Sequence, residues 1–225
     1  MNLEKYQQYS RIARGLEKAD LVLKDARIVN VFTEEIIRGD IAIQDGIIAG
    51  IGSFHGKEER DLAGRYVCPG FIDSHLHLES TLVTPAELVT AASRHGTTTF
   101  IVDPHESANV SGLAGIDYIL DQTEDVKANV YVMMPSCVPA TAIDDNGCTL
   151  TAEDMVPYLH NSRILGLGEV MDSISVVQGE KSMHDKLELF EGRIRDGHAP
   201  FLEEGDLQAY AMAGIATDHE CSFFD

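Results

Sequence analysis

The stretch "PGFIDSHLHLES", residues 69–80, ends an apolar run on His-x-His. Residues i and i+2 of a strand point to the same face, so His75 and His77 are expected to leave the backbone side by side. Imidazole nitrogens are common ligands of transition metals. Two imidazoles aimed at one point can therefore chelate a metal ion.

Three more candidate ligands lie at the polar ends of later apolar segments: Glu169 in "GLGEVM", His198 in "DGHAP" and His219 in "TDHE". Two cations about 3.5 to 4 Å apart need a shared anionic bridge. Glu169 is suited to that role, because no Lys or Arg lies between residues 164 and 178 to neutralise it as a buried ion pair. Each residue alone is a weak signal, and a lone histidine near a strand end is more typical of a packing residue, so the prediction depends on their coming together.

Other polar residues flank these positions. Asp73 precedes His75 by two residues and is predicted to share its face, where it could accept a hydrogen bond from an imidazole or remain a solvated turn residue. Asp218 and Glu220 flank His219. Either of them, or Glu106, is a candidate proton shuttle, and the sequence does not choose among the three.

The stretch "DPHESANVSG", residues 103–112, is predicted to be a loop after the second strand. It holds Asp103, His105, Glu106 and Asn109. Loops after barrel strands commonly carry specificity groups. An Asn with a Glu can recognise the ring nitrogens and amine of a heterocycle; alternatively the loop only caps the next helix.

The elements that must position these residues change in character along the chain. A helix is predicted over residues 3–18, followed by short β-rich runs up to about residue 67 that indicate a small antiparallel sheet. From residue 69 apolar strands alternate with helix-sized segments, and their polar ends at residues 77, 103, 135, 169, 198 and 219 are spaced as βα units require. This pattern predicts a parallel barrel or doubly wound sheet, and no GxGxxG or Walker motif supports the latter.

Composition narrows the function. The 225 residues are 44% hydrophobic and carry a net charge of −20, which disfavours nucleic acid and anionic membranes as partners and suits a neutral or cationic small molecule. The charged N-terminus does not resemble a signal peptide and no apolar run is long enough to span a membrane, so we expect a cytoplasmic protein. Cys68, Cys137, Cys148 and Cys221 are scattered and are expected to be reduced.

Five blocks, "PGFIDSHLHLESTLVTP", "HGTTTFIVDPHESANVSG", "GLGEVM", "DGHAP" and "TDHE", resemble in order and spacing the adenine deaminase family of the metal-dependent amidohydrolase superfamily. The resemblance covers nearly the whole chain. It implies an α/β fold, an incomplete (β/α)8 TIM-type barrel over residues 68–225 that holds the first six strands, with an N-terminal helix and partial β-sandwich over residues 1–67. It also implies that the last two barrel strands and a C-terminal region are lacking, so that the chain alone is expected to have little activity.

The function implied by the resemblance is hydrolytic deamination of adenine to hypoxanthine and ammonia by a metal-activated hydroxide, in purine salvage. The implied cofactor is a binuclear Mn²⁺ or Fe²⁺ centre, with Zn²⁺ as a further candidate. The implied roles are metal binding for His75, His77, Glu169, His198 and His219, catalysis for Glu169 and His219, adenine binding for His105, Glu106 and Asn109, and support of the ligands for Asp73 and Asp103. Whether His219 binds metal or polarises the ring is open, as is homo-oligomer formation.

Two alternatives belong to different classes. Another amidohydrolase, which cleaves a cyclic amide or an N-acetyl group, would share the barrel and the metals, because loops select the substrate. A non-catalytic fragment that keeps only metal binding is the other. Ammonia release from adenine distinguishes the first alternative, and metal stoichiometry distinguishes the second.

Overall fold

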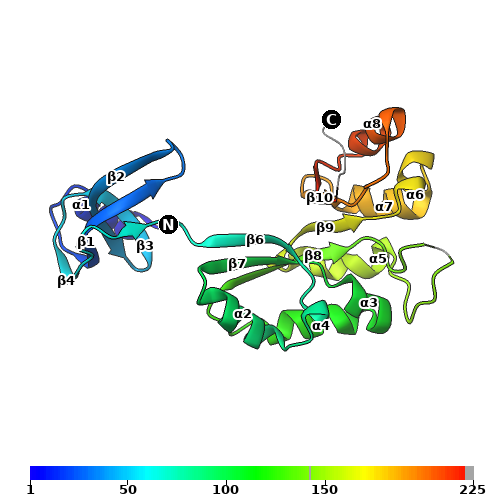
Figure 1. Cartoon of the computed structure of the whole chain (residues 1–225), viewed down its shortest axis with the longest axis horizontal. Coiled ribbons are helices and arrows are strands. Elements are labelled where there is room, and N and C mark those ends of the chain that lie inside the picture. Colours follow the sequence, from blue (N-terminus) through cyan, green and yellow to red (C-terminus); the bar gives the residue numbers. More distant parts are fainter. Residues whose placement is uncertain (142, 221–225) are drawn as a thin grey trace. The chain divides into compact units, whose positions relative to one another are not determined.

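The computed structural model describes residues 1–141 and 143–220. The chain divides into two compact units, Met1–Pro69 and a second unit that begins at Gly70 (Figure 1). The sequence analysis places this boundary after residue 67. Each unit has its own sheet, and each is described separately below.

The N-terminal unit is a helix followed by a five-stranded mixed sheet in the order β3-β2-β1-β4, with β5 also paired to β1. Its elements are α1 (Leu3–Ala13), β1 (Ala19–Asn30), β2 (Glu35–Gln44), β3 (Ile47–Gly52), β4 (Gly56–Asp61) and β5 (Tyr66–Val67). Strands β1 to β3 pair antiparallel, whereas β4 and β5 run parallel to β1, so the prediction of an antiparallel sheet is wrong for these two strands. The described residues of this unit form a single sheet, and the sandwich stays a prediction.

Helix α1 ends at Ala13 rather than at residue 18 because the backbone turns at Gly15. Gly15 has φ of 71°, a left-handed conformation that terminates helices. Its N–H donates to the Ile12 carbonyl at 2.8 Å, and the Leu16 N–H donates to the Arg11 carbonyl at 2.9 Å. These bonds satisfy carbonyls at the helix end, and the chain then enters β1.

The second unit is built on a six-stranded sheet in the order β11-β10-β9-β8-β7-β6, with all neighbouring strands parallel. The strands are β6 (Phe71–Leu76), β7 (Thr97–Val102), β8 (Asn129–Pro135), β9 (Ile164–Val170), β10 (Ile194–Gly197) and β11 (Thr217–Asp218). Strands adjacent in the sequence are adjacent in space. This order is that of a (β/α)8 barrel and not of a doubly wound sheet, whose strand order reverses at a switch point.

Helices connect the strands and lie on the outer side of the curved sheet (Figure 1). They are α2 (Pro85–Ser93), α3 (His105–Ser111), α4 (Leu113–Gln122), α5 (Ala152–Met155), α6 (Ser173–Gln178), α7 (Lys181–Leu189) and α8 (Glu204–Met212), with 3-10 turns at Glu79–Thr81 and Val156–His160. The prediction of a loop over residues 103–112 is wrong, because α3 occupies most of it and buries Ala108 against the core. Helix α6 is a further element that the sequence pattern did not indicate.

Two strands depart from regular pairing at positions that matter for the site. From Asp73 to Leu76, β6 advances by three residues while its partner β7 advances by two. From Leu167 to Val170, β9 likewise advances by three residues while β10 advances by two. An extra residue in a strand is a bulge, which bends the strand and redirects a side chain. The bulges hold His75 and Glu169, respectively.

Arg163 lies just before β9, at the opposite end of this strand from the Glu169 bulge, and it joins three segments. Its guanidinium donates to the Val130 carbonyl at 3.0 Å, to the Leu120 carbonyl at 2.8 Å and to the Thr123 hydroxyl. We predict that Arg163→Ala lowers the free energy of unfolding by about 1.5 to 3 kcal/mol, because half-buried acceptors lose a charged donor. Urea denaturation followed by circular dichroism measures this change.

The matched control is Arg94→Ala, whose side chain is exposed and has no hydrogen bond or ion pair to a described residue. Equal urea midpoints for the two variants would show that the Arg163 contacts do not stabilise the second unit, which is called the barrel unit from here on.

Candidate metal centre

The carboxyl ends of the strands bring the predicted ligands together around the Glu169 carboxylate. Glu169 is buried, with 3% of its surface exposed. Its Oε1 atom lies near four imidazoles, at 3.0 Å from His75 Nε2, 3.3 Å from His77 Nε2, 3.0 Å from His219 Nε2 and 3.7 Å from His198 Nδ1. His75 lies in β6, and the other three rings follow β6, β10 and β11, so residues up to 144 positions apart in the sequence meet at one point.

The backbone at Glu169 has φ of 24°, a conformation that residues other than glycine rarely adopt. Its carbonyl accepts hydrogen bonds from the Ser136 hydroxyl at 2.7 Å and from the Met171 N–H at 2.7 Å. Strain of this kind persists only where the surroundings enforce it, and it is concentrated at functional sites. Here the bulge and the Ser136 contact hold the carboxylate toward the imidazoles.

Gly168 leaves room for a second buried carboxylate beside Glu169. A Cβ atom at position 168 would lie 2.0 Å from Asp103 Oδ2 and 2.7 Å from Met133 Cβ. Asp103 is 1% exposed and follows β7. Only glycine lets its carboxylate approach this closely.

Asp103 also fixes the orientation of the neighbouring His77 ring. Its backbone carbonyl lies 2.8 Å from His77 Nδ1, which assigns the ring proton to Nδ1 and leaves the Nε2 lone pair facing Glu169 and His75. His105, the first residue of α3, places Nδ1 at 2.8 Å from Glu169 Oε2 and at 3.6 Å from Asp103 Oδ1. The structure therefore puts His105 inside the cluster of imidazoles.

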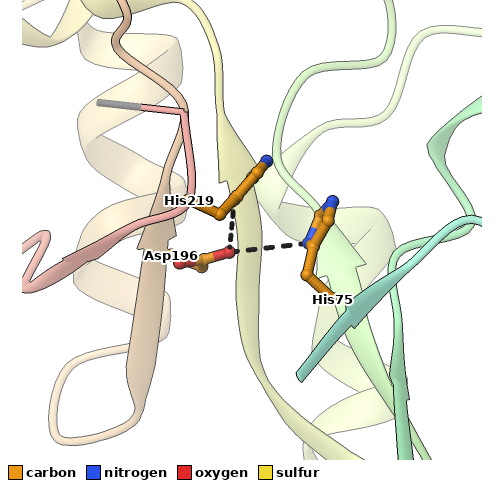
Figure 2. Close-up of side chains that lie close together, drawn as sticks. All are labelled: His75, Asp196 and His219. Carbon is orange, nitrogen blue, oxygen red and sulfur yellow. Dashed lines mark hydrogen bonds and ion pairs between the residues drawn. The ribbon is translucent and has the colours of Figure 1, made fainter. Parts of the chain in front are cut away.

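Asp196 is a member of the cluster that the sequence analysis missed. Figure 2 shows its carboxylate between His75 and His219, with Oδ2 at 3.8 Å and 3.2 Å from their Nδ1 atoms. Its other oxygen accepts a hydrogen bond from the Thr217 hydroxyl at 2.6 Å. Asp196 lies two residues before His198, and the same spacing that drew attention to Asp73 could have found it.

Asp73 lies apart from the imidazoles. Its side chain forms no hydrogen bond or ion pair with any residue in the described part of the chain. The bulge between Asp73 and Leu76 explains this difference, because an extra residue breaks the alternation that would place Asp73 and His75 on one face.

The remaining predicted residues lie at the edge of the cluster. Glu106 accepts a hydrogen bond from the Ser80 hydroxyl at 2.6 Å and has Oε2 at 3.6 Å from His77 Nδ1. It adjoins Glu79, which the sequence analysis also missed and whose pKa burial raises to about 7. Asn109, with a side chain that has no hydrogen bond to a described residue, lines with His105 and Glu106 a cavity of about 450 Å³.

Asp218 and Glu220 differ from Glu106 as candidate proton shuttles. The Asp218 carboxylate accepts hydrogen bonds from the backbone N–H groups of Ala199 at 2.9 Å and Glu220 at 2.8 Å. Both oxygens are therefore engaged in holding the chain around His198. Glu106 is the candidate that faces the cavity beside the cluster.

The electrostatics of the cluster favour a positive charge at its centre. Burial opposes ionisation of Glu169, but the attraction of His105, His75 and His77 outweighs it and holds the pKa of the carboxyl well below its usual range. The Glu169 carboxylate raises the pKa of His77 to about 9. Burial alone would lower the pKa of His105, yet Asp103 and Glu169 together raise it to about 10. Carboxylates that stabilise the charged form of neighbouring imidazoles this strongly also attract a divalent cation.

The donor set fits metal ions. Both Asp103 carboxylate oxygens are buried without a hydrogen-bond partner among the described residues, and Glu169 Oε2 has only the ion pair with His105. Buried lone pairs of this kind are costly unless a donor or a cation satisfies them. Among the described residues, three groups whose donor atoms lie within 4.8 Å of one another include Glu169: one with His75 and His77, one with His198 and His219, and one with Asp103 and His105. The first two consist of the predicted ligands and are called the two ligand groups.

Other sequence-based expectations concern thiols and membranes. Cys68, Cys137 and Cys148 are free, and Cys221 lies outside the described residues. Among the helices of the described part, none combines the length and the apolar composition needed to cross a bilayer.

Comparison with known proteins shows which sequences and structures the chain is similar to. Adenine deaminase of Desulfitobacterium hafniense is 58% identical in a match that covers 98% of this chain and 39% of the deaminase. Adenine deaminase of Clostridium acetobutylicum is 50% identical in a match that covers 93% of this chain and 37% of the deaminase. The chain thus spans under two fifths of the length of these curated relatives. The solved structure of N-acyl-D-glutamate deacylase from Bordetella bronchiseptica, a complex with zinc and a phosphonate inhibitor, has a similar fold. The match covers 88% of this chain and 48% of the deacylase chain, with a TM-score of 0.59 and 18% identity.

The family model for the amidohydrolase family matches residues 66–225, which include every strand of the six-stranded sheet and every residue of the cluster around Glu169. Since this match covers more than two thirds of the sequence, the chain belongs to the amidohydrolase family.

Proposed function

We propose that the chain is the metal-binding portion of an adenine deaminase, an enzyme that hydrolyses adenine to hypoxanthine and ammonia. The observation that carries this proposal is the buried Glu169 carboxylate with four imidazoles on one oxygen, in a chain whose relatives named adenine deaminase align over nearly all of it. The hydrolase chemistry follows from the cluster. The choice of adenine follows from the relatives.

The residues that would hold a metal pair are assigned by the two ligand groups. His75, His77 and Glu169 form one position, and Glu169, His198 and His219 form the other, with Glu169 shared between them. When bound, such a pair activates water as a nucleophile near neutral pH and offsets negative charge that develops on the substrate. Mixed imidazole and carboxylate donors suit Mn²⁺ or Fe²⁺, which we propose as the native pair, with Zn²⁺ as the third candidate.

The adenine site in this proposal is the cavity beside the cluster. Glu106 and Asn109 line it and offer an acceptor and an amide, the groups that recognise ring nitrogens and an exocyclic amine. Glu106 Oε2 is buried without a hydrogen-bond partner among the described residues, so it is available to a ligand. His105 contacts both the cavity and Glu169, and we assign it to the junction between substrate and metals.

The setting of the reaction is part of the same proposal. We place it in purine salvage in the cytoplasm, where a small-molecule base is the substrate. The free state of the three described cysteines supports a reducing compartment. A different amidohydrolase activity has support only at the level of the fold, through the deacylase structure at 18% identity.

The first prediction from this proposal concerns the number of metal ions bound per chain. The chain is expected to bind two Mn²⁺ ions, and His75→Ala/His77→Ala is expected to lose at least one of them, because one ligand group keeps only Glu169. Equilibrium dialysis followed by elemental analysis measures the bound metal. The matched control is His95→Ala/His160→Ala, which removes two exposed histidines outside the cluster. Equal metal content in both double variants would refute the assignment of the His-x-His pair.

The second prediction concerns Asp196. Its carboxylate faces the Nδ1 atoms of His75 and His219, so it orients both rings with their Nε2 atoms toward Glu169. We expect Asp196→Asn to weaken Mn²⁺ binding by about 10- to 100-fold, as loss of a carboxylate behind ligand histidines commonly does. Calorimetric titration gives the affinity. Asp185→Asn, which removes an exposed carboxylate paired with Lys181, should leave it unchanged.

The third prediction concerns the reaction. Adenine hydrolysis by the purified protein loaded with Mn²⁺ is expected to be weak for this chain alone and to release ammonia and hypoxanthine in equal amounts. Glu169→Gln is expected to lower kcat/KM by more than about 100-fold, because the anionic bridge is lost. A coupled ammonia assay and chromatography of the bases measure both products. Turnover of a hydantoin or an N-acetyl sugar in place of adenine would favour the alternative amidohydrolase.

A further inference from the structure

Strands β9 and β10 carry Glu169 and His198 at their carboxyl ends, and the pairing between them changes just there. After Arg195 pairs with Leu167, the next pair is Gly197 with Val170, because the Glu169 bulge adds a residue to β9. Past this pair, a continued parallel ladder would join a backbone N–H of β10 directly to a carbonyl of β9.

A tyrosine hydroxyl stands at that place instead. Tyr210 Oη donates to the Val170 carbonyl at 2.6 Å and accepts from the His198 N–H at 3.1 Å. Its hydroxyl thus links the residue that follows Glu169 to the backbone of His198. One oxygen atom is inserted between the two strand ends, and it widens the gap between them.

The tyrosine is held rigidly enough to set this gap. It is 2% exposed, comes from α8, and belongs to the same core as Val170, Ala199 and Ile215. Helix α8 itself supplies no residue to the cluster around Glu169. Tyr210 touches the backbone of the ligand-bearing segments and none of their donor atoms.

The gap has a chemical consequence. Two donors bound to one ion at about 2.0 to 2.2 Å are themselves separated by roughly 3 to 3.5 Å, so a metal position tolerates little change in ligand spacing. Glu169 Oε1 lies 3.7 Å from His198 Nδ1, and His198 Nδ1 lies 3.3 Å from His219 Nε2. Closing or opening the strand ends moves His198 relative to the other two ligands.

We propose that Tyr210 is a positioning residue whose hydroxyl, inserted between the ends of β9 and β10, sets the spacing of Glu169 and His198 and so the affinity of the metal position that they share with His219. This inference rests on the metal centre of the proposed function. It adds a residue outside the ligand set that determines metal affinity. It predicts that loss of the Tyr210 hydroxyl weakens one of the two metal positions and leaves the other unchanged.

The test is a Co²⁺ titration of the whole chain, with Co²⁺ as the only ligand, followed by visible absorption and by calorimetry. Tyr210→Phe removes the hydroxyl and keeps the ring. We expect the first Co²⁺ to bind as in the unsubstituted chain, the second to bind about 10- to 100-fold more weakly, and the absorption bands of the second ion to change. Equal affinity and equal spectra in the two proteins would overturn the positioning role and leave the metal centre standing.

The matched control is Tyr158→Phe. Its hydroxyl also makes a 2.6 Å hydrogen bond, to Asp117, at a place remote from the cluster. This variant should keep both Co²⁺ affinities, so a loss shared by both variants would assign the effect to general destabilisation and overturn the proposal. Absence of Co²⁺ binding by the unsubstituted chain would overturn the metal centre and the role of Tyr210 with it.

A loss of folding by Tyr210→Phe is separated from a change of spacing by a second measurement. The titration is repeated in trimethylamine N-oxide, which favours the folded state by its exclusion from the protein surface. A weakened second position that persists in the osmolyte, with native circular dichroism, supports the proposal. Full recovery of both affinities there would refute it.

Discussion

The burial of one carboxylate at the meeting point of several imidazoles is the constraint on which the rest of the barrel unit depends. Glu169 is 3% exposed, and a buried carboxylate is stable only if cationic or donating groups surround it. The nearby chain offers none, because no Lys or Arg lies between residues 164 and 178. The groups must therefore come from other strands.

The parallel strand order satisfies this requirement. Strands β6 to β11 lie side by side in the order of the sequence, so their carboxyl ends share one edge and deliver His75, His198 and His219 to the same place. An antiparallel arrangement would send alternate ends to opposite edges. The fold and the cluster thus solve the same electrostatic problem, and the metal pair that we propose would complete it by replacing protons on the imidazoles.

The sequence was informative where the chemistry depends on residue type and on strand order. His-x-His, Glu169, His198 and His219 could be identified from their places at the ends of apolar segments, and the six-stranded parallel sheet brings them together as the spacing indicated. Their roles as ligands stay predictions. The parallel pairing of β4 and β5 with β1 was not foreseeable, because such short strands carry no signal of their direction.

The sequence was uninformative where the backbone departs from regular geometry. A bulge has no reliable signature in residue type, so the separation of Asp73 from the imidazoles and the positive φ of Glu169 could not be derived. Asp196 shows the opposite case. It lies two residues before His198 and its carboxylate does reach the rings of His75 and His219, so the simple rule of alternation would have sufficed there.

Each imidazole of the cluster has two nitrogens, and the surroundings decide which one faces Glu169. The Asp103 carbonyl takes Nδ1 of His77, and the Asp196 carboxylate lies behind Nδ1 of His75 and His219, so all three rings present Nε2 to Glu169. The residues that do this orienting sit on β7 and β10 or just after them, and Ser136 and Tyr210 hold the Glu169 and Val170 carbonyls from β8 and α8. The metal affinity that we propose for this chain would consequently depend on the packed sheet edge. A comparison of related chains that considers only the five predicted ligand positions would miss the residues that fix their geometry.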